Sequence, residues 1–175
     1  MRPQGDGMSR VLLVLLLLLG SMGCKDEPRR VENENLGFAA TFPGPPKLYR
    51  HTEPGPFGDM EWFDMSMSPS GRLDETFDVA VGNLPPGDKG GTTPSQVLTT
   101  FQNVLTYRFG GIRRTELPAS RGPGFRYKVK SPNGGIVEGI VVLRQGRLHH
   151  AQAIVRKEGD PRTAAFLDDF EVRTR

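Results

Sequence analysis

Cysteine is almost absent from this 175-residue chain, because Cys24 is the only one. A single cysteine excludes a disulfide within the chain, so packing and hydrogen bonds alone must hold the fold. Tryptophan is equally rare, with one residue. The longest apolar run, Val11–Leu19, has nine residues. A membrane-spanning helix needs roughly 20 such residues, so a permanent transmembrane anchor is not expected.

Signatures of catalysis and of cofactor binding are also missing from the sequence. It contains no HExxH zinc motif, no EF-hand loop and no phosphate-binding loop. The segment Ser68–Gly71 does not have the spacing of a nucleophile elbow. We therefore expect no metal, no cofactor and no catalytic residue, and the sequence defines no molecular activity for the folded part.

The first residues have the parts of an export signal. Arg2 and Arg10 precede the apolar run, and small residues follow it up to Cys24. A positive start, a short apolar core and a small-residue cleavage site are typical of a secretory signal peptide. Residues 1–23 are predicted to be that peptide, and export argues against nucleic acid as a partner.

Cys24 leaves two outcomes open after export. Its position after Gly23 resembles the lipobox of bacterial lipoproteins, and the resemblance implies that Cys24 carries a diacylglycerol. Each buried CH₂ contributes about 0.8 kcal/mol, and two acyl chains anchor a protein stably. If the enterobacterial sorting rule applies, Lys25 implies the outer membrane. Alternatively, Ser21 and Gly23 suit ordinary signal peptidase, which would give a soluble periplasmic or secreted protein.

Residues 24–35 are expected to form a lipid-attached charged tether. The segment Lys25–Asn35 has seven charged side chains, and Val31 is its only apolar one. Such a stretch does not bury enough surface to fold. The folded part is therefore predicted to be one domain over residues 36–175, which is long enough for one hydrophobic core.

Within this domain the pattern predicts strands, a helix, more strands and a short closing helix. The helix spans Pro94–Phe109, where Thr93 and Gln96 form a capping box. Its apolar stripe, which is expected to face the core, comprises Val97, Phe101, Val104 and Leu105. Asp160 caps the closing helix. This order is typical of an α+β fold with a mostly antiparallel sheet flanked by helices. The expected strands cover residues 36–42, 59–68, 77–81, 125–130, 136–143 and 147–156.

Two short motifs at the ends of the domain resemble a known family. The segment Phe38–Pro46 reads FAATFPGPP and Phe166–Phe170 reads FLDDF, and both are similar to the ends of PsbP-like domains. The resemblance covers residues 36–172. It implies an α-β-α sandwich with an accessory or assembly role, and it transfers no catalytic residue.

Charge is unevenly distributed along the chain. Residues 51–100 have two basic and eight acidic side chains, whereas residues 101–175 have fourteen basic and seven acidic ones. Arg126, Lys128 and Lys130 share one face of an expected strand. The preferred interpretation is a solvated face that the acidic half of the chain partly neutralises. The alternative prediction is that this row binds an anionic lipid surface or an acidic envelope protein.

The leading hypothesis is a lipid-anchored, non-catalytic envelope protein with a binding or assembly role. A second hypothesis is a small exported hydrolase or lyase that uses His149 or His150 with Asp168 or Asp169 as acidic partner. Neighbours on a strand point to opposite faces, so the two histidines are not expected to share a metal. The simplest expectation is one exposed and one half-buried histidine.

A third hypothesis is a soluble exported ligand sensor. It requires a deep pocket, which we expect to be lined by Trp62, Phe63 and Met65.

Overall fold

The structure is a computed structural model that describes residues 27–69, 74–84 and 92–173. The predicted signal peptide and Cys24 lie outside the described residues. Within the described part of the chain, no helix is both long and apolar enough to span a membrane.

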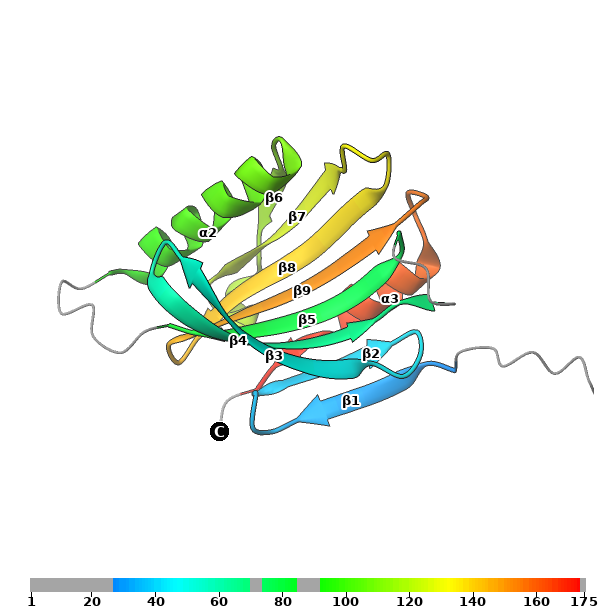
Figure 1. Cartoon of the computed structure of the whole chain (residues 1–175), viewed down its shortest axis with the longest axis horizontal. Helices are drawn as coiled ribbons and strands as arrows, with labels where there is room; N and C mark the ends of the chain where they lie inside the picture. The colour runs from blue at the N-terminus through cyan, green and yellow to red at the C-terminus, as the bar shows by residue number, and fades with distance from the viewer. Residues whose placement is uncertain (1–26, 70–73, 85–91, 174–175) are drawn as a thin grey trace, which may run out of the picture.

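The larger of two sheets has seven strands, all antiparallel to their neighbours. The chain runs through this sheet as two blocks, one before and one after the long helix (Figure 1). The strands, in their order across the sheet, are β3 (Lys47–Gly55), β4 (Gly58–Met67), β5 (Thr76–Asn83), β9 (Arg147–Val155), β8 (Ile136–Arg144), β7 (Gly124–Lys130) and β6 (Arg113–Glu116).

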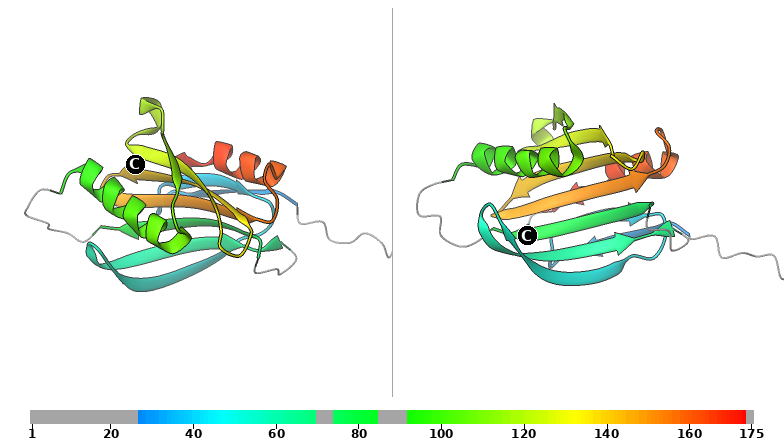
Figure 2. Two further views of the ribbon diagram at one scale, coloured as in Figure 1. Left: turned by 90° about the horizontal axis from the view of Figure 1, so that it is seen from above. Right: turned by 45° about the horizontal axis from the view of Figure 1, so that its top comes forward.

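Further elements cover this sheet and complete the fold. Helix α2 and helix α3 lie apart, with strands of the sheet between them (Figure 2). The elements are helix α2 (Pro94–Phe109), a 3-10 turn η2 (Ala119–Arg121), helix α3 (Pro161–Asp169) and a small sheet of β1 (Arg29–Asn33), β2 (Phe38–Phe42) and β10 (Glu171–Val172).

Two hydrophobic cores lie on the two faces of the large sheet. On one face, α3 and β2 pack against β5, β8 and β9. The centroid of the Phe166 ring lies 5.2 Å from that of Phe42 and 5.5 Å from that of Phe77. On the other face, α2 packs against β7, β8 and β9 through the side chains of Phe101 and Leu105. The predicted α+β class with a mostly antiparallel sheet is confirmed.

Helix α2 begins and ends as its sequence predicts. The Thr93 hydroxyl accepts a hydrogen bond from the Gln96 N–H at 3.3 Å, and the Gln96 side chain accepts one from the Thr93 N–H at 2.7 Å. Gly110 ends the helix with a φ of 78°, which favours glycine. Val104, from the predicted apolar stripe, is 39% exposed and therefore lies outside the core.

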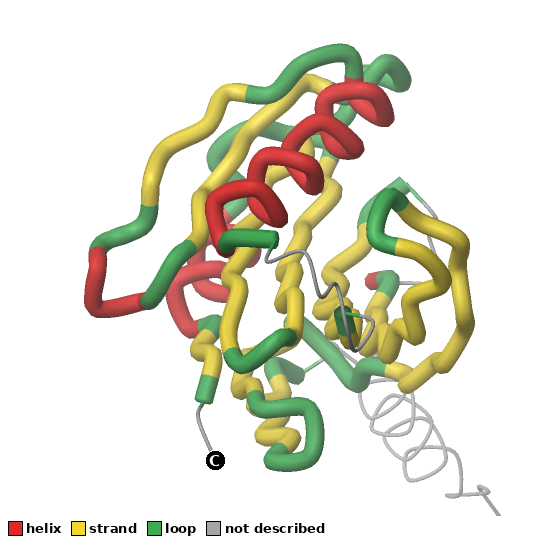
Figure 3. Tube along the Cα trace, turned by 90° about the vertical axis from the view of Figure 1, so that its left-hand side faces the viewer, coloured by secondary structure: helices red, strands yellow, loops and turns green. Residues whose placement is uncertain are grey.

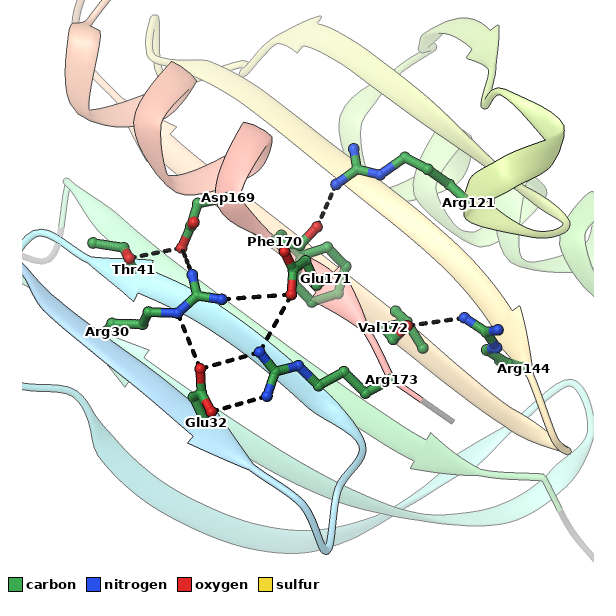
Figure 4. Close-up of polar contacts among 10 residues, drawn as sticks. All are labelled: Arg30, Glu32, Thr41, Arg121, Arg144, Asp169, Phe170, Glu171, Val172 and Arg173. Atoms are coloured by element: carbon green, nitrogen blue, oxygen red, sulfur yellow. Dashed lines mark hydrogen bonds and ion pairs between the residues drawn. The ribbon is translucent and has the colours of Figure 1, made fainter. Parts of the chain in front are cut away.

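The prediction that residues 24–35 form an unfolded tether is wrong for Arg29–Asn33. These residues form β1, which pairs with β2 along its whole length. Charge pairs with residues 169–173 stabilise this strand (Figure 4), and its apolar Val31 packs against the core. Arg30 contacts Asp169 at 2.5 Å, and Glu32 accepts hydrogen bonds from Arg173 at 2.9 and 3.0 Å.

Candidate ligand-binding cleft

A cleft of about 520 Å³ lies between α2 and the β3–β4 hairpin. The hairpin stands at the side of the molecule and faces α2 (Figure 3). The floor of the cleft is the face of the sheet that carries Trp62, Ala80 and His150. Two other pockets lined by described residues are each about 140 Å³, so this cleft is several times larger than either, and it is large enough for a small molecule.

Apolar and aromatic side chains form most of the cleft wall. The Trp62 and Phe101 rings lie 6.3 Å apart between centroids, and Val104 extends this wall along α2. Gly82 keeps space beneath the Trp62 ring, because a Cβ atom there would lie 2.8 Å from the Trp62 Cζ3 atom. The remaining apolar lining residues are Pro54, Pro56, Phe57, Met60 and Leu105.

The hairpin side of the cleft is acidic. Asp64 Oδ2 lies 3.1 Å from His51 Nδ1, and Glu53 Oε2 lies 3.8 Å from His51 Nε2. Desolvation raises the pKa of Asp64 above its ordinary value, and the nearby His51 opposes that shift. The sequence did not predict this cluster of His51, Glu53 and Asp64. His51 and Asp64 come close only because β3 pairs with β4 in this register.

The helix side of the cleft carries a positive charge. Arg108 lines the cleft from the last turn of α2, and its guanidinium lies 5.4 Å from the Phe109 ring centroid. Burial raises the pKa of Asp78, whereas hydrogen bonds from Ser66 and Thr76 and the charge of Arg108 lower it. The two sides of the cleft therefore carry charges of opposite sign.

His150 is held in a buried hydrogen-bonded chain at the floor of the cleft. Its Nε2 lies 2.7 Å from the Tyr127 hydroxyl, which donates to Gln152 Oε1 at 2.9 Å. Because the hydroxyl proton goes to Gln152, the neutral ring carries its own proton on Nε2 and donates it to Tyr127. Burial lowers the pKa of His150 to about 3, so the ring is neutral near pH 7.

His149 points to the opposite face of the sheet, as the alternation of a strand requires. Its Nε2 donates to the Leu36 carbonyl at 3.0 Å, and desolvation lowers its pKa. The expectation of one exposed and one half-buried histidine is wrong, because His149 and His150 are only 2% and 9% exposed. Packing on both faces of β9 buries both rings.

Neither predicted acidic partner contacts these histidines. Asp169 binds Arg30 and the Thr41 hydroxyl at 2.5 and 2.6 Å, and Asp168 binds Arg126 at 3.0 Å. The predicted pairing of His149 or His150 with Asp168 or Asp169 is therefore wrong. Helix α3 carries both carboxylates and packs on the sheet face opposite to His150.

The predicted pocket lining is correct only for Trp62. Phe63 and Met65 alternate with Trp62 along β4 and pack against the core beneath α3 and β2. The cleft forms on the other face, where Asp64 follows Trp62. The alternation of β4 alone thus separates the three residues.

The predicted basic row does lie on one face of β7, but much of its charge is balanced. Arg126 pairs with Asp168, and Lys128 contacts Glu138 and Glu158 at 2.9 and 2.8 Å. Lys130 is exposed at the end of the strand. Binding of an anionic surface by Arg126, Lys128 and Lys130 stays a prediction.

The described residues contain no group of three or more His, Cys, Asp or Glu side chains that could hold a metal ion. Likewise, the described residues that line the cleft include no Ser, Thr, Cys, Lys or Tyr. These residue types supply the hydroxyl, thiol and amine nucleophiles of covalent catalysis. The cleft thus offers apolar contact and charge but none of these nucleophiles.

Comparisons with known proteins do not identify a family for this chain. No protein-family model matches the sequence, and no curated protein matches it either. A similar solved structure is the solution structure of cyanobacterial PsbP (CyanoP) from Synechocystis sp. PCC 6803, which is 12% identical. The likeness covers 87% of this chain and 96% of that chain, with a TM-score of 0.48. Such a likeness carries no information on function.

Proposed function

We propose that this protein is a lipid-anchored envelope protein that binds an amphipathic small molecule in the cleft and does not transform it. The observation that carries the proposal is the cleft itself, with its volume of about 520 Å³ between α2 and the β3–β4 hairpin. Small-molecule sites are typically concave, mostly apolar and supplied with a few polar groups.

The lining defines the chemical class of the ligand. The Trp62 and Phe101 rings offer a flat apolar surface at the floor. Glu53 and Asp64 line the cleft on the hairpin, and Arg108 lines it on α2. A ligand with an apolar body and a polar or zwitterionic end matches this arrangement.

Binding without reaction agrees with the state of His150. Its ring is neutral, and its Nε2 is already engaged with Tyr127 at 2.7 Å. A general acid–base group works best with a pKa near the operating pH. A histidine with a pKa of about 3 is far from that condition.

A hydrolase or lyase remains the second candidate, and it now rests on different residues. The contact of 3.1 Å between His51 Nδ1 and Asp64 Oδ2 lies in the cleft, where a carboxylate orients an imidazole. Turnover of an ester or amide panel that is lost in His51→Ala would favour this candidate over simple binding.

The anchor places the domain close to the membrane. Strand β1 begins at Arg29, so only a short segment separates the fold from Cys24. At about 3.5 Å per residue this segment spans at most about 18 Å. A ligand that partitions between the cleft and a lipid surface would then travel a short distance, and the outer membrane is the proposed location.

Fractionation of cells tests the anchor. Cys24→Ala should move the protein from the membrane fraction to the soluble exported fraction, whereas Cys24→Ser with the same export signal serves as a second non-acylated variant. If both variants stay with the membrane as the parent protein does, lipid anchoring is wrong.

Trp62 provides a direct test of the cleft, because it is the only tryptophan in the chain. Titration with an anilinonaphthalene probe should quench Trp62 emission by energy transfer. Ala80→Phe fills the floor and should abolish the transfer, while Tyr107→Ala is the matched control, since Tyr107 is 93% exposed on α2. Equal binding by Ala80→Phe and the parent would contradict the proposal.

A further inference from the structure

The outer edge of β3 is a long strand edge that no described residue pairs with. Strand β3 ends the order of the seven-stranded sheet, and all nine of its residues are exposed. Leu48 and Tyr49 are 56% and 53% exposed, which is unusual for large apolar side chains in the described part of this chain. An open edge of this length is a template for pairing with another strand.

The hairpin turn determines which main-chain groups face outward. Gly55 pairs with Gly58 across the two-residue turn, and such closing pairs are hydrogen-bonded. Hydrogen-bonded and non-hydrogen-bonded pairs alternate along an antiparallel ladder. Every second residue before Gly55 therefore bonds to β4, and the residues between them point the other way. The residues whose N–H and C=O groups point away from β4 include Leu48, Arg50 and Thr52. Pro54 has the same orientation, where its missing N–H costs no ladder bond.

We propose that β3 pairs in antiparallel fashion with β3 of a second copy of this chain, about a two-fold axis at Arg50. The two seven-stranded sheets then join edge to edge. Arg50 of the two subunits exchange main-chain hydrogen bonds at the axis, and Leu48 pairs with Thr52 of the partner subunit on each side. Such an isologous contact closes after two subunits.

Charge complementarity selects this register. With the axis at Arg50, Lys47 lies opposite Glu53 of the partner subunit, and the symmetry makes this pair twice. Both residues occupy non-hydrogen-bonded positions of the new ladder, where side chains approach most closely. Lys47 forms no ion pair within the described residues, so its charge is available for Glu53, which in its own subunit lies 3.8 Å from His51 Nε2.

The arginines that meet at the axis bring their own counter-charges. Arg50 donates from Nε to Glu61 Oε1 at 2.7 Å, and its guanidinium lies 5.3 Å from the Phe63 ring centroid. Each guanidinium is thus directed along β4, away from the open edge. The two like charges at the axis are therefore partly neutralised before the subunits meet.

Pairing at this edge also changes the cleft, a step that rests on the proposed function. His51 and Glu53 line the cleft and lie on the same face of β3 as Tyr49. In the dimer, Tyr49 of the partner subunit lies opposite His51, and Lys47 of the partner subunit lies opposite Glu53. The second copy therefore completes the rim, and ligand binding and dimer formation should favour each other.

Sedimentation of the full chain in detergent tests the interface. The parent protein should be a dimer. Lys47→Glu or Glu53→Lys should each raise the dimer Kd by about tenfold, because each variant puts two like charges opposite each other at both of the symmetry-related 47–53 pairs. The double variant Lys47→Glu/Glu53→Lys restores opposite charges and should restore the parent affinity. A monomeric parent, or a double variant as weak as the single ones, would overturn the proposal.

Cross-linking in intact cells gives a second measurement that does not depend on purification. Arg50→Cys places two thiols at the axis, within the Cα separation of about 5.5 Å that a disulfide accepts. Thr52→Cys is the control, since its two copies lie several residues apart in this register. A dimer band with Thr52→Cys and none with Arg50→Cys would refute the register. Energy transfer from Trp62 in a monomeric charge variant would show that the cleft functions without the dimer.

Discussion

The hydroxyl oxygen of Tyr127 lies 2.7 Å from Nε2 of His150, and this contact joins the floor of the cleft to the core beneath α2. Tyr127 also donates to Gln152 at 2.9 Å, so a single hydroxyl satisfies two buried polar side chains. Gly139 allows the ring this position, because a Cβ atom there would lie 2.5 Å from Tyr127 Cε1.

Removal of that hydroxyl should destabilise the protein. Tyr127→Phe leaves His150 and Gln152 without their shared partner, and an unsatisfied buried polar group costs about 1–3 kcal/mol. Urea unfolding measures the loss of free energy. Tyr107→Phe removes the same hydroxyl from an exposed ring and should change the free energy of unfolding by less than about 0.5 kcal/mol. Equal effects of both variants would contradict the buried chain.

Acid should destabilise the parent protein through His150. The pKa of this ring is about 3 in the folded state against an ordinary value of 6.5, so the unfolded chain binds the proton first as pH falls. The contribution of His150 to the free energy of unfolding is therefore fully present above pH 6.5, the ordinary pKa that the ring has in the unfolded chain. Below that pH the free energy of unfolding falls by up to about 1.4 kcal/mol per pH unit.

The non-titrating variant His150→Gln isolates this contribution. The other shifted groups, which include His149 with a lowered pKa and Asp64 with a raised one, are present in both proteins and largely cancel in the difference. As pH falls from about 7 to about 5, the parent should lose about 2 kcal/mol of unfolding free energy relative to His150→Gln. A difference that does not vary with pH would show that His150 is not buried in its neutral form.

The ends of α2 and the start of α3 could be predicted from the sequence, because neighbouring residues determine them. The capping box of Thr93 and Gln96 predicts the start of α2, and Gly110 predicts its end. Asp160 caps α3 in the same way, since its carboxylate accepts from the Arg162 N–H at 2.9 Å. In each case the interacting residues are close together in the chain.

Elements that depend on distant residues could not be predicted in this way. Strand β1 is charged, and the carboxylate that binds its Arg30 belongs to Asp169, which lies 139 residues further along the chain. Strand β3 shows no apolar alternation, and it forms because it pairs with β4. The cleft combines side chains from β3, β4, β5, β9 and α2, so no single segment carries its pattern.

Reversal of one charge in β1 should loosen that strand alone. Glu32 pairs with Arg30 at 3.1 Å and with Arg173 at 2.9 Å, and all three side chains are substantially exposed. Glu32→Lys should therefore increase amide hydrogen exchange several-fold across Arg29–Asn33, with little change in the midpoint of global unfolding. Glu27→Lys makes the same change of charge just before the strand, at an exposed residue, and serves as a comparison. Unchanged exchange in β1 would mean that main-chain pairing with β2 holds the strand without these charges.

Gly82 controls the position of the Trp62 ring from beneath. In Gly82→Ala the new Cβ atom would lie 2.8 Å from both the Met60 Cε and Trp62 Cζ3 atoms, a separation that real structures do not tolerate. The flexible Met60 end can move, whereas the rigid indole must shift toward the cleft. The substitution should cost about 1–3 kcal/mol in stability, shift Trp62 emission and weaken probe binding. Gly55→Ala is the matched control, because its Cβ would meet only ordinary contacts from 3.6 Å. If Gly82→Ala binds the probe as the parent does, Trp62 is not part of the binding surface.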